Sequence, residues 1–210
     1  MLTLGISTSS GQFALVLGEG GRTIYNSKEF EVNNELDDML LSALKSCGKE
    51  VKDISGIIVD IGPGGTSRVR TGVAFANSLS YSTKIPIYPV SSMELAGVDA
   101  GSRYNLPVVA TVKSIKGNAY IGLYDNGQVT IKYGPIEEIP AMTEGLDKFA
   151  VVGFHREAII NLPALENKTV IDTEMLYGDV SLFAEKDELF KKREGINFPY
   201  FAQPVTENTI

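Results

Sequence analysis

The N-terminal part of the chain alternates between segments that predict strands and short glycine-rich stretches that predict turns. The expected strands are Leu2–Thr8, Gln12–Gly18 and Arg22–Val32, which together predict a three-stranded meander. An amphipathic helix follows, because the next apolar residues are spaced three and four positions apart. This apolar stripe consists of Leu36, Met39, Leu40, Ala43, Leu44 and Cys47.

Strands and helices alternate in the rest of the first half. Ile54–Ile61 is an apolar run that predicts a buried strand, and Arg68–Ser82 is expected to be the second helix. A fifth strand over Ile85–Val90 and a third helix over Ser91–Val98 complete this half.

The same order of elements returns in the second half. The expected strands are 107–113, 118–124, 128–133, 149–153 and 168–171, and the expected helices are 143–148, 155–160 and 180–193. This pattern-level duplication predicts an α/β protein of two lobes, each with a mixed sheet and flanking helices, over residues 1–102 and 103–210. The last helix is a candidate for packing back on the first lobe. The aromatic and proline-bearing tail, residues 198–204, is expected to pack on the protein, with partner binding as the alternative.

Composition and charge narrow the functional classes. The chain has 210 residues, a net charge of −7, one cysteine and one histidine. An acidic protein is a poor candidate for gripping nucleic acid by itself, and one cysteine with one histidine disfavours a zinc site. No apolar run approaches the roughly 20 residues that cross a bilayer, and the N-terminal residues do not resemble a signal peptide. We therefore expect a cytoplasmic protein without a metal, another cofactor or a membrane partner.

A glycine-rich stretch between the fourth strand and the second helix is a candidate phosphate loop. The Walker and dinucleotide patterns, begun at Gly62, both require a glycine at position 67, which is Ser67 here. Spacing alone favours a tight strand-to-helix turn by about two to one, with Thr66 or Ser67 as the helix cap. The alternative is a vestigial nucleotide or anion site at the helix N-terminus, and its candidate residues are Gly62, Gly64, Gly65, Thr66 and Ser67.

With its flanking residues, this stretch resembles the motif of a known family. Residues 62–74 (GPGGTSRVRTGVA) resemble the Gly-Pro-Gly-Ser-Phe-Thr-Gly-Leu-Arg-Ile-Gly-x-Ala motif of the TsaB (YeaZ) family. Residues 90–96 (VSSMELA) resemble that family's Val-Ser-Ser-Leu-x-x-Leu-Ala segment. Residues 6–9 (ISTS) lie where the family has Ile-Asp-Thr-Ala or Ile-Asp-Thr-Ser. The resemblance is clear over residues 1–100 and weaker beyond them.

The resemblance implies a fold and a function. The fold is the superfold shared by actin, sugar kinases and Hsp70, with two ribonuclease-H-like lobes related by duplication. The implied function is that of a non-catalytic scaffold subunit that binds TsaD, the catalytic paralogue, and with it the ATPase TsaE. That system transfers a threonylcarbamoyl group to the adenosine next to the anticodon of tRNA. The resemblance also implies a homodimer when the chain is alone, and contact with tRNA only indirectly.

Residues at the positions of the superfold's catalytic groups argue against chemistry by this chain. In actin-like ATPases an acid follows the first strand of each lobe, whereas these positions hold Ser7 and Lys113 here. TsaD has two metal-binding histidines on its first helix, and the matching segment that begins at residues 33–38 has none. His155 is expected at or near the surface, and Cys47 in the core. The rival hypothesis is a self-contained nucleotide-dependent enzyme or glycoprotease-like hydrolase of the same superfold, which would need acids or metal ligands in that cleft.

The first two predicted helices are the expected partner interface, because they carry the subunit contact in the family. Small residues on the second helix would let a partner helix approach closely, and Leu41 on the first lies off the apolar stripe. The competing interpretation of each apolar residue is packing in the core of the chain itself. The candidate interface residues are Leu36, Met39, Leu40, Ala43, Leu44, Val69, Gly72, Val73, Ala76 and Leu79.

Overall fold

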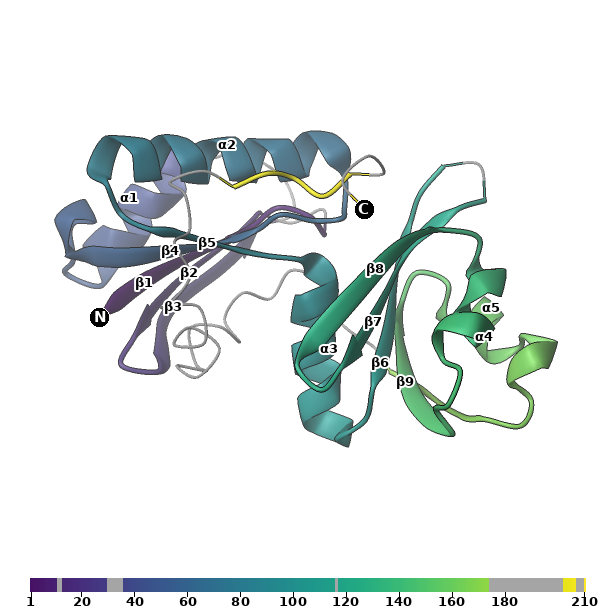
Figure 1. Cartoon of the computed structure of the whole chain (residues 1–210). Helices are drawn as coiled ribbons and strands as arrows, with labels where there is room; N and C mark the ends of the chain where they lie inside the picture. The colour runs from purple at the N-terminus through teal and green to yellow at the C-terminus, as the bar shows by residue number, and fades with distance from the viewer. Residues whose placement is uncertain (11–12, 30–35, 116, 174–201, 207–209) are drawn as a thin grey trace. The chain divides into compact units, whose positions relative to one another are not determined.

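Two five-stranded sheets, each in its own unit, form the framework of the protein (Figure 1). The computed structural model describes residues 1–10, 13–29, 36–115, 117–173, 202–206 and 210. Unit 1 contains residues 1–91 and 202–204, and unit 2 begins at Ser92. The predicted two-lobed α/β duplication is confirmed, because both sheets have three antiparallel strands followed by two parallel ones in the same spatial order.

Unit 1 has the strand order β3-β2-β1-β4-β5. Adjacent strands β1 to β3 are antiparallel, whereas β4 pairs in parallel with both β1 and β5. Helix α1 connects β3 to β4 by way of a 3₁₀ turn, and α2 connects β4 to β5. The elements are β1 (Leu2–Ser7), β2 (Phe13–Glu19), β3 (Arg22–Glu29), α1 (Leu36–Ser46), η1 (Val51–Asp53), β4 (Ile54–Asp60), α2 (Thr66–Thr83) and β5 (Ile87–Val90).

The main core of unit 1 lies between one face of its sheet and the two helices α1 and α2, which cover that face in Figure 1. Alternate strand residues such as Leu4, Leu15 and Ile57 point into this core and are fully buried. They meet the apolar stripe of α1 and residues such as Val73 on α2. Burying these side chains is the main stabilising contribution, at roughly 1.5–3 kcal/mol for each large one.

Unit 2 repeats the order, with strands arranged β10-β9-β6-β7-β8. Helix α3 packs on one face of the sheet, against β6, β7 and β9, and the short elements α4, α5 and η3 pack on the other (Figure 1). The elements are α3 (Ser92–Tyr104), β6 (Val108–Lys113), β7 (Ala119–Asp125), β8 (Gln128–Gly134), η2 (Ile136–Glu138), α4 (Ile139–Met142), β9 (Lys148–Gly153), α5 (Arg156–Ile160), η3 (Pro163–Leu165) and β10 (Thr169–Asp172).

Helix α3 belongs to unit 2, whereas the sequence-based division at residues 102 and 103 assigned it to the first lobe. Its buried residues Met93, Ala96 and Ala100 pack with Val108 and Ala150 of the second sheet. The boundary between the units consequently falls between β5 and α3. The helix also continues beyond its expected end at Val98, because its apolar stripe extends to Ala100.

Two glycines allow α3 to lie unusually close to β7. A Cβ atom at Gly97 would lie 2.2 Å from Cγ of Tyr124, and one at Gly122 would lie 2.7 Å from Cβ of Met93. Neither position has room for a side chain, since real Cβ atoms do not approach other atoms so closely. The ring of Tyr124 therefore rests directly on the backbone of α3.

One expected helix is wrong, and another lies outside the described residues. The helix predicted over 143–148 does not form: α4 ends at Met142, residues 143–145 are a turn in which Gly145 has φ +82°, and Lys148 begins β9. Residues 180–193 and their proposed packing on the first lobe lie outside the described residues. The described helices are all too short or too polar to cross a membrane.

Candidate functional site

A buried carboxylate lies where strands β1 and β4 end, in the region predicted to correspond to the superfold's catalytic cleft. Ile6 pairs with Val59 across the two parallel strands, so the next residues, Ser7 and Asp60, are neighbours. Asp60 is fully buried, and its Oδ2 accepts hydrogen bonds from Ser7 Oγ, at 2.7 Å, and from Ser9 Oγ. Its Oδ1 accepts one from the Gly62 backbone N–H, at 2.9 Å. These bonds offset the high cost of burying a carboxylate.

The glycine loop packs against Ser9, which follows strand β1. A Cβ atom at Gly64 would lie 2.6 Å from the backbone oxygen of Ser9, so only glycine fits there. The Gly65 N–H donates to that same oxygen at 3.3 Å. Gly62 has φ +86°, which glycine adopts without strain. The glycines therefore form a turn that packs on the end of β1, in agreement with the tight-turn interpretation.

Residue Thr8 fastens the first turns of α2 to the same junction. Its Oγ1 donates to the Arg68 carbonyl oxygen at 2.7 Å, and a Cβ at Gly72 would lie 2.5 Å from that hydroxyl. Gly72, a predicted interface residue, thus has an internal packing role. The cluster of Ser7, Thr8, Ser9 and Asp60, here termed the strand-end junction, fixes where α2 begins.

The five candidate anion-site residues lie together in the loop and the first turn of α2, but their surroundings disfavour an anion. Two of the loop's N–H groups, those of Gly62 and Gly65, already have acceptors within the chain. The carboxylate of Asp60 adjoins the loop and would repel a phosphate. The helix cap is Gly65, without a side-chain capping bond, so the cap predicted at Thr66 or Ser67 is wrong.

Most of the predicted interface residues form the core of unit 1 instead. Nine of the ten are buried, and Leu79 is half-buried against the same core. Their side chains face the sheet because the apolar stripe of a surface helix first covers its own sheet. An arginine at Ala76, which is fully buried, would disturb the fold before it tested any interface.

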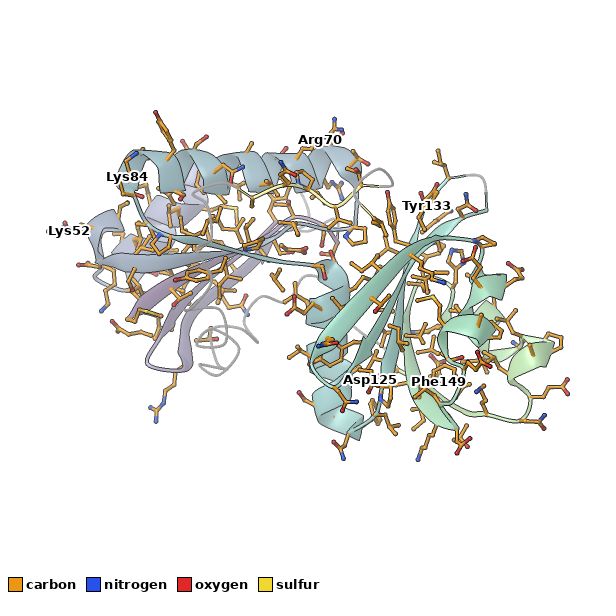
Figure 2. The ribbon with its side chains drawn as sticks, viewed as in Figure 1. Lys52, Arg70, Lys84, Asp125, Tyr133 and Phe149 are labelled. Carbon is orange, nitrogen blue, oxygen red and sulfur yellow. The ribbon has the colours of Figure 1, made fainter. Side chains whose placement is uncertain are left out.

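The outer faces of α1 and α2 form a second surface, here termed the helix face. It includes two large apolar side chains, Leu41 with 58% of its surface exposed and Tyr81 with 73% exposed. Lys84 Nζ lies 4.4 Å from the centroid of the Tyr81 ring. Figure 2 shows Arg70 pointing away from the sheet near one end of α2 and Lys84 at the other end. The helix face comprises Asp37, Asp38, Leu41, Ser42 and Lys45 of α1 and Arg70, Ala74, Ser78 and Tyr81 of α2.

A segment near the C-terminus is hydrogen-bonded to α2. The Asn77 side chain donates from Nδ2 to the Ala202 oxygen at 3.0 Å and accepts from the Ala202 N–H at 2.7 Å. Ala202 is buried in the core of unit 1, and the yellow segment 202–204 runs alongside α2 in Figure 1. Packing of the tail on the protein is confirmed for this residue, whereas residues 198–201 lie outside the described part.

Lys113, which is predicted to match the second acid of the superfold, has an aromatic neighbour. Lys113 ends β6 with its side chain exposed, and its Nζ lies 4.9 Å from the centroid of the Phe154 ring. His155 is half-buried beside that ring, and Cys47 is half-buried against the core of unit 1. Across the described ranges, no three side chains of His, Cys, Asp or Glu gather as metal ligands would.

Comparison with known proteins gives one family. Residues 31–199 match the family model described as TsaD, tRNA N6-adenosine threonylcarbamoyltransferase. The TsaB protein of Bacillus subtilis is 34% identical over 98 residues, 47% of this chain and 40% of that protein. A tRNA N6-adenosine threonylcarbamoyltransferase of Caldicellulosiruptor bescii is 29% identical over 45% of this chain and 34% of its own length. The matched regions thus span well under half of these relatives.

Solved structures agree with the fold. YeaZ from Pseudomonas aeruginosa superimposes with a TM-score of 0.79 at 18% identity and covers 98% of this chain and 99% of its own. A second structure from that organism, with similarity to peptidase YeaZ, gives 0.77 at 19% identity. The resemblance to TsaB (YeaZ) predicted from the motifs is confirmed by these names, and the predicted fold by these structures.

Sequence reasoning missed the central residue of the junction. The strand predicted over 54–61 includes Asp60, and a charged residue within an apolar run, two positions before a glycine, is itself a signal of a special environment. Asn77 gave no signal, since its partner Ala202 is 125 positions away. Leu41 was detectable, because it lies off the apolar stripe of α1.

Proposed function

Because this chain belongs to the TsaD family of tRNA N6-adenosine threonylcarbamoyltransferases, with TsaB (YeaZ) proteins among its relatives, we propose that it is a non-catalytic scaffold subunit. Its partner would be TsaD, and through that complex TsaE, in threonylcarbamoyl transfer to the adenosine next to the anticodon of tRNA. A role in tRNA modification would require the chain to be in the cytoplasm, where the tRNA is.

The exposure of Leu41 and Tyr81 on the helix face is the observation that carries the proposal. A leucine and a tyrosine with more than half of their surface in water are candidates for burial against another protein. Both lie on helices whose inner stripes are already fully used in the core. The small side chains of Ala74 and Ser78 lie between the ends of α2 and would allow a partner helix to approach closely.

The strand-end junction supports the absence of catalysis. Ser7, at the position of the first acid, donates to Asp60 and has no negative charge of its own. Lys113, at the position of the second acid, has the opposite sign from a magnesium ligand. Asp60 does supply a carboxylate close to the first position, but its oxygens already accept three hydrogen bonds and are inaccessible to solvent.

The proposed mechanism is selection of a conformation. Binding energy at the helix face would favour the TsaD conformation that is competent for transfer, because a ligand shifts an equilibrium by its difference in affinity for the two states. The net charge of −7 disfavours direct binding of RNA by this chain, so tRNA would bind to the partner. The same helix face would join two copies into a homodimer when TsaD is absent.

Replacing both Leu41 and Tyr81 by glutamate should weaken binding to TsaD by roughly a hundredfold or more, because two buried apolar contacts would become buried charges. The affinity is measured by titration calorimetry and the size of the complex by light scattering. Ile24→Glu is the matched control, since Ile24 is an exposed apolar residue of β3 in the same unit. Equal affinity of the double variant and the control would exclude the helix face as the interface.

A further inference from the structure

Unit 2 contains a cavity that the proposed function does not use. Its volume is about 470 Å³, and it lies between the C-terminal end of α3 and the turn that joins β7 to β8. That volume is within the usual range of sites for small molecules. Its lining residues are Val98, Gly101, Ser102, Asn105, Leu106, Pro107, Tyr124, Asp125 and Asn126.

The charges around this cavity favour a cation. Among its nine described lining residues, Asp125 is the only one with a charged side chain, and it is half-buried. Figure 2 shows Asp125 at the same end of unit 2 as the end of α3. On α3 itself the nearby charges are Glu94, Asp99 and Arg103, of which the last two pair with each other. The helix C-terminus adds partial negative charge from its last carbonyl groups.

Tyr124 adds a second feature that attracts cations. Its ring lies against α3 over Gly97 and Gly101, where a Cβ at Gly101 would be 3.4 Å from the ring. Burial raises the pKa of Tyr124, and the nearby negative charge of Glu94 raises it further. Aromatic rings favour ammonium groups placed over them.

The remaining lining residues suit the rest of an aliphatic amine. Val98, Leu106 and Pro107 offer apolar surface for a methylene chain. On the polar side, Ser102, Asn105 and Asn126 have side-chain oxygens that can accept hydrogen bonds from an ammonium group. The lining thus combines one anion, apolar surface and neutral acceptors.

We propose that this cavity binds a small aliphatic diamine. One ammonium group pairs with the Asp125 carboxylate beside Tyr124, the methylene chain lies on Val98 and Leu106, and the second ammonium group hydrogen-bonds to neutral side-chain oxygens. This site is independent of the helix face, because all of its lining residues belong to unit 2.

The test uses 1,4-diaminobutane as the probe and the full chain as the protein. Titration calorimetry should show binding of the diamine and none of 1,4-butanediol, which has the same chain length without charge. Asp125→Asn should weaken diamine binding by about tenfold or more, since a charge-assisted hydrogen bond is lost. Glu157→Gln, an exposed carboxylate on α5, is the matched control and should leave the affinity unchanged.

A second variant, away from the turn between β7 and β8, keeps the test valid if Asp125→Asn does not fold. Ser102→Lys places a cation at the exposed end of α3 and should also abolish binding, while circular dichroism shows that both variants are folded. The proposal is overturned if the diol binds as well as the diamine, or if Asp125→Asn binds the diamine with unchanged affinity. Absence of binding at roughly 10 mM diamine would overturn it as well.

Discussion

Replacing Asp60 by alanine should lower the free energy of unfolding by about 3–5 kcal/mol, a large part of the stability of a domain. The carboxylate is fully buried and accepts from the hydroxyls of Ser7 and Ser9 and from the Gly62 N–H. Without it, three buried donors lose their acceptor, and each unsatisfied group costs about 1–3 kcal/mol. Chemical denaturation with urea measures the change.

Two control variants distinguish the effect of losing the hydrogen bonds to Asp60 from the effect of losing a carboxylate. Asp60→Asn keeps one acceptor oxygen and should lose about half as much stability. Asp147→Ala removes an exposed carboxylate and should change the free energy of unfolding by less than about 0.5 kcal/mol. A loss below about 1 kcal/mol for Asp60→Ala would contradict the view that the junction holds the start of α2.

The second large effect is expected at Gly97, where alanine should lower the free energy of unfolding by about 2–3 kcal/mol. Helix propensity alone predicts the opposite, because alanine is favoured over glycine in a helix by about 1 kcal/mol. The new Cβ would lie 2.2 Å from Cγ and 2.3 Å from Cβ of Tyr124, so the helix or the strand must move. Thermal and urea unfolding report the change.

The same helix supplies the control for this substitution. At Gly101 a Cβ would lie 3.4 Å or more from its nearest neighbours, so Gly101→Ala should be neutral or slightly stabilising. In the double variant Gly97→Ala and Tyr124→Gly, the three Tyr124 atoms that the new Cβ would meet are absent, and the two changes should cost less than the sum of their separate effects. If the two changes in the free energy of unfolding were strictly additive, there would be no steric conflict between a side chain at position 97 and Tyr124.

The order of elements was predictable from sequence because it depends on local patterns. The three strands before α1 and the apolar run of β4 follow from alternation and from glycine-rich turns, and both features return in unit 2. The unit boundary was less accessible, since α3 follows β5 directly and only its contacts with β6 and β7 reveal its unit. The helix predicted over 143–148 does not form, because Gly145 adopts a left-handed conformation. The sequence shows the glycine but not the conformation that it adopts.

The candidate site was only partly predictable, because it depends on contacts between distant residues. Asp60 and Ser7 are 53 positions apart and meet because β1 and β4 are parallel neighbours. The apolar stripe of α1 predicts a buried face, but periodicity cannot tell whether that face meets a sheet or a partner. The structure assigns it to the core and leaves Leu41 and Tyr81 as the exposed apolar residues of the helix face.

Reconstitution of threonylcarbamoyl transfer tests the central claim most directly. TsaD and TsaE encoded in the same genome are incubated with tRNA and threonylcarbamoyl-AMP, with and without this chain, and the modified adenosine is quantified. The scaffold account predicts modification that depends on this chain, and no nucleotide hydrolysis by the chain alone. Transfer that proceeds equally well without the chain, together with nucleotide hydrolysis by the chain alone, would contradict the account and favour a self-contained enzyme.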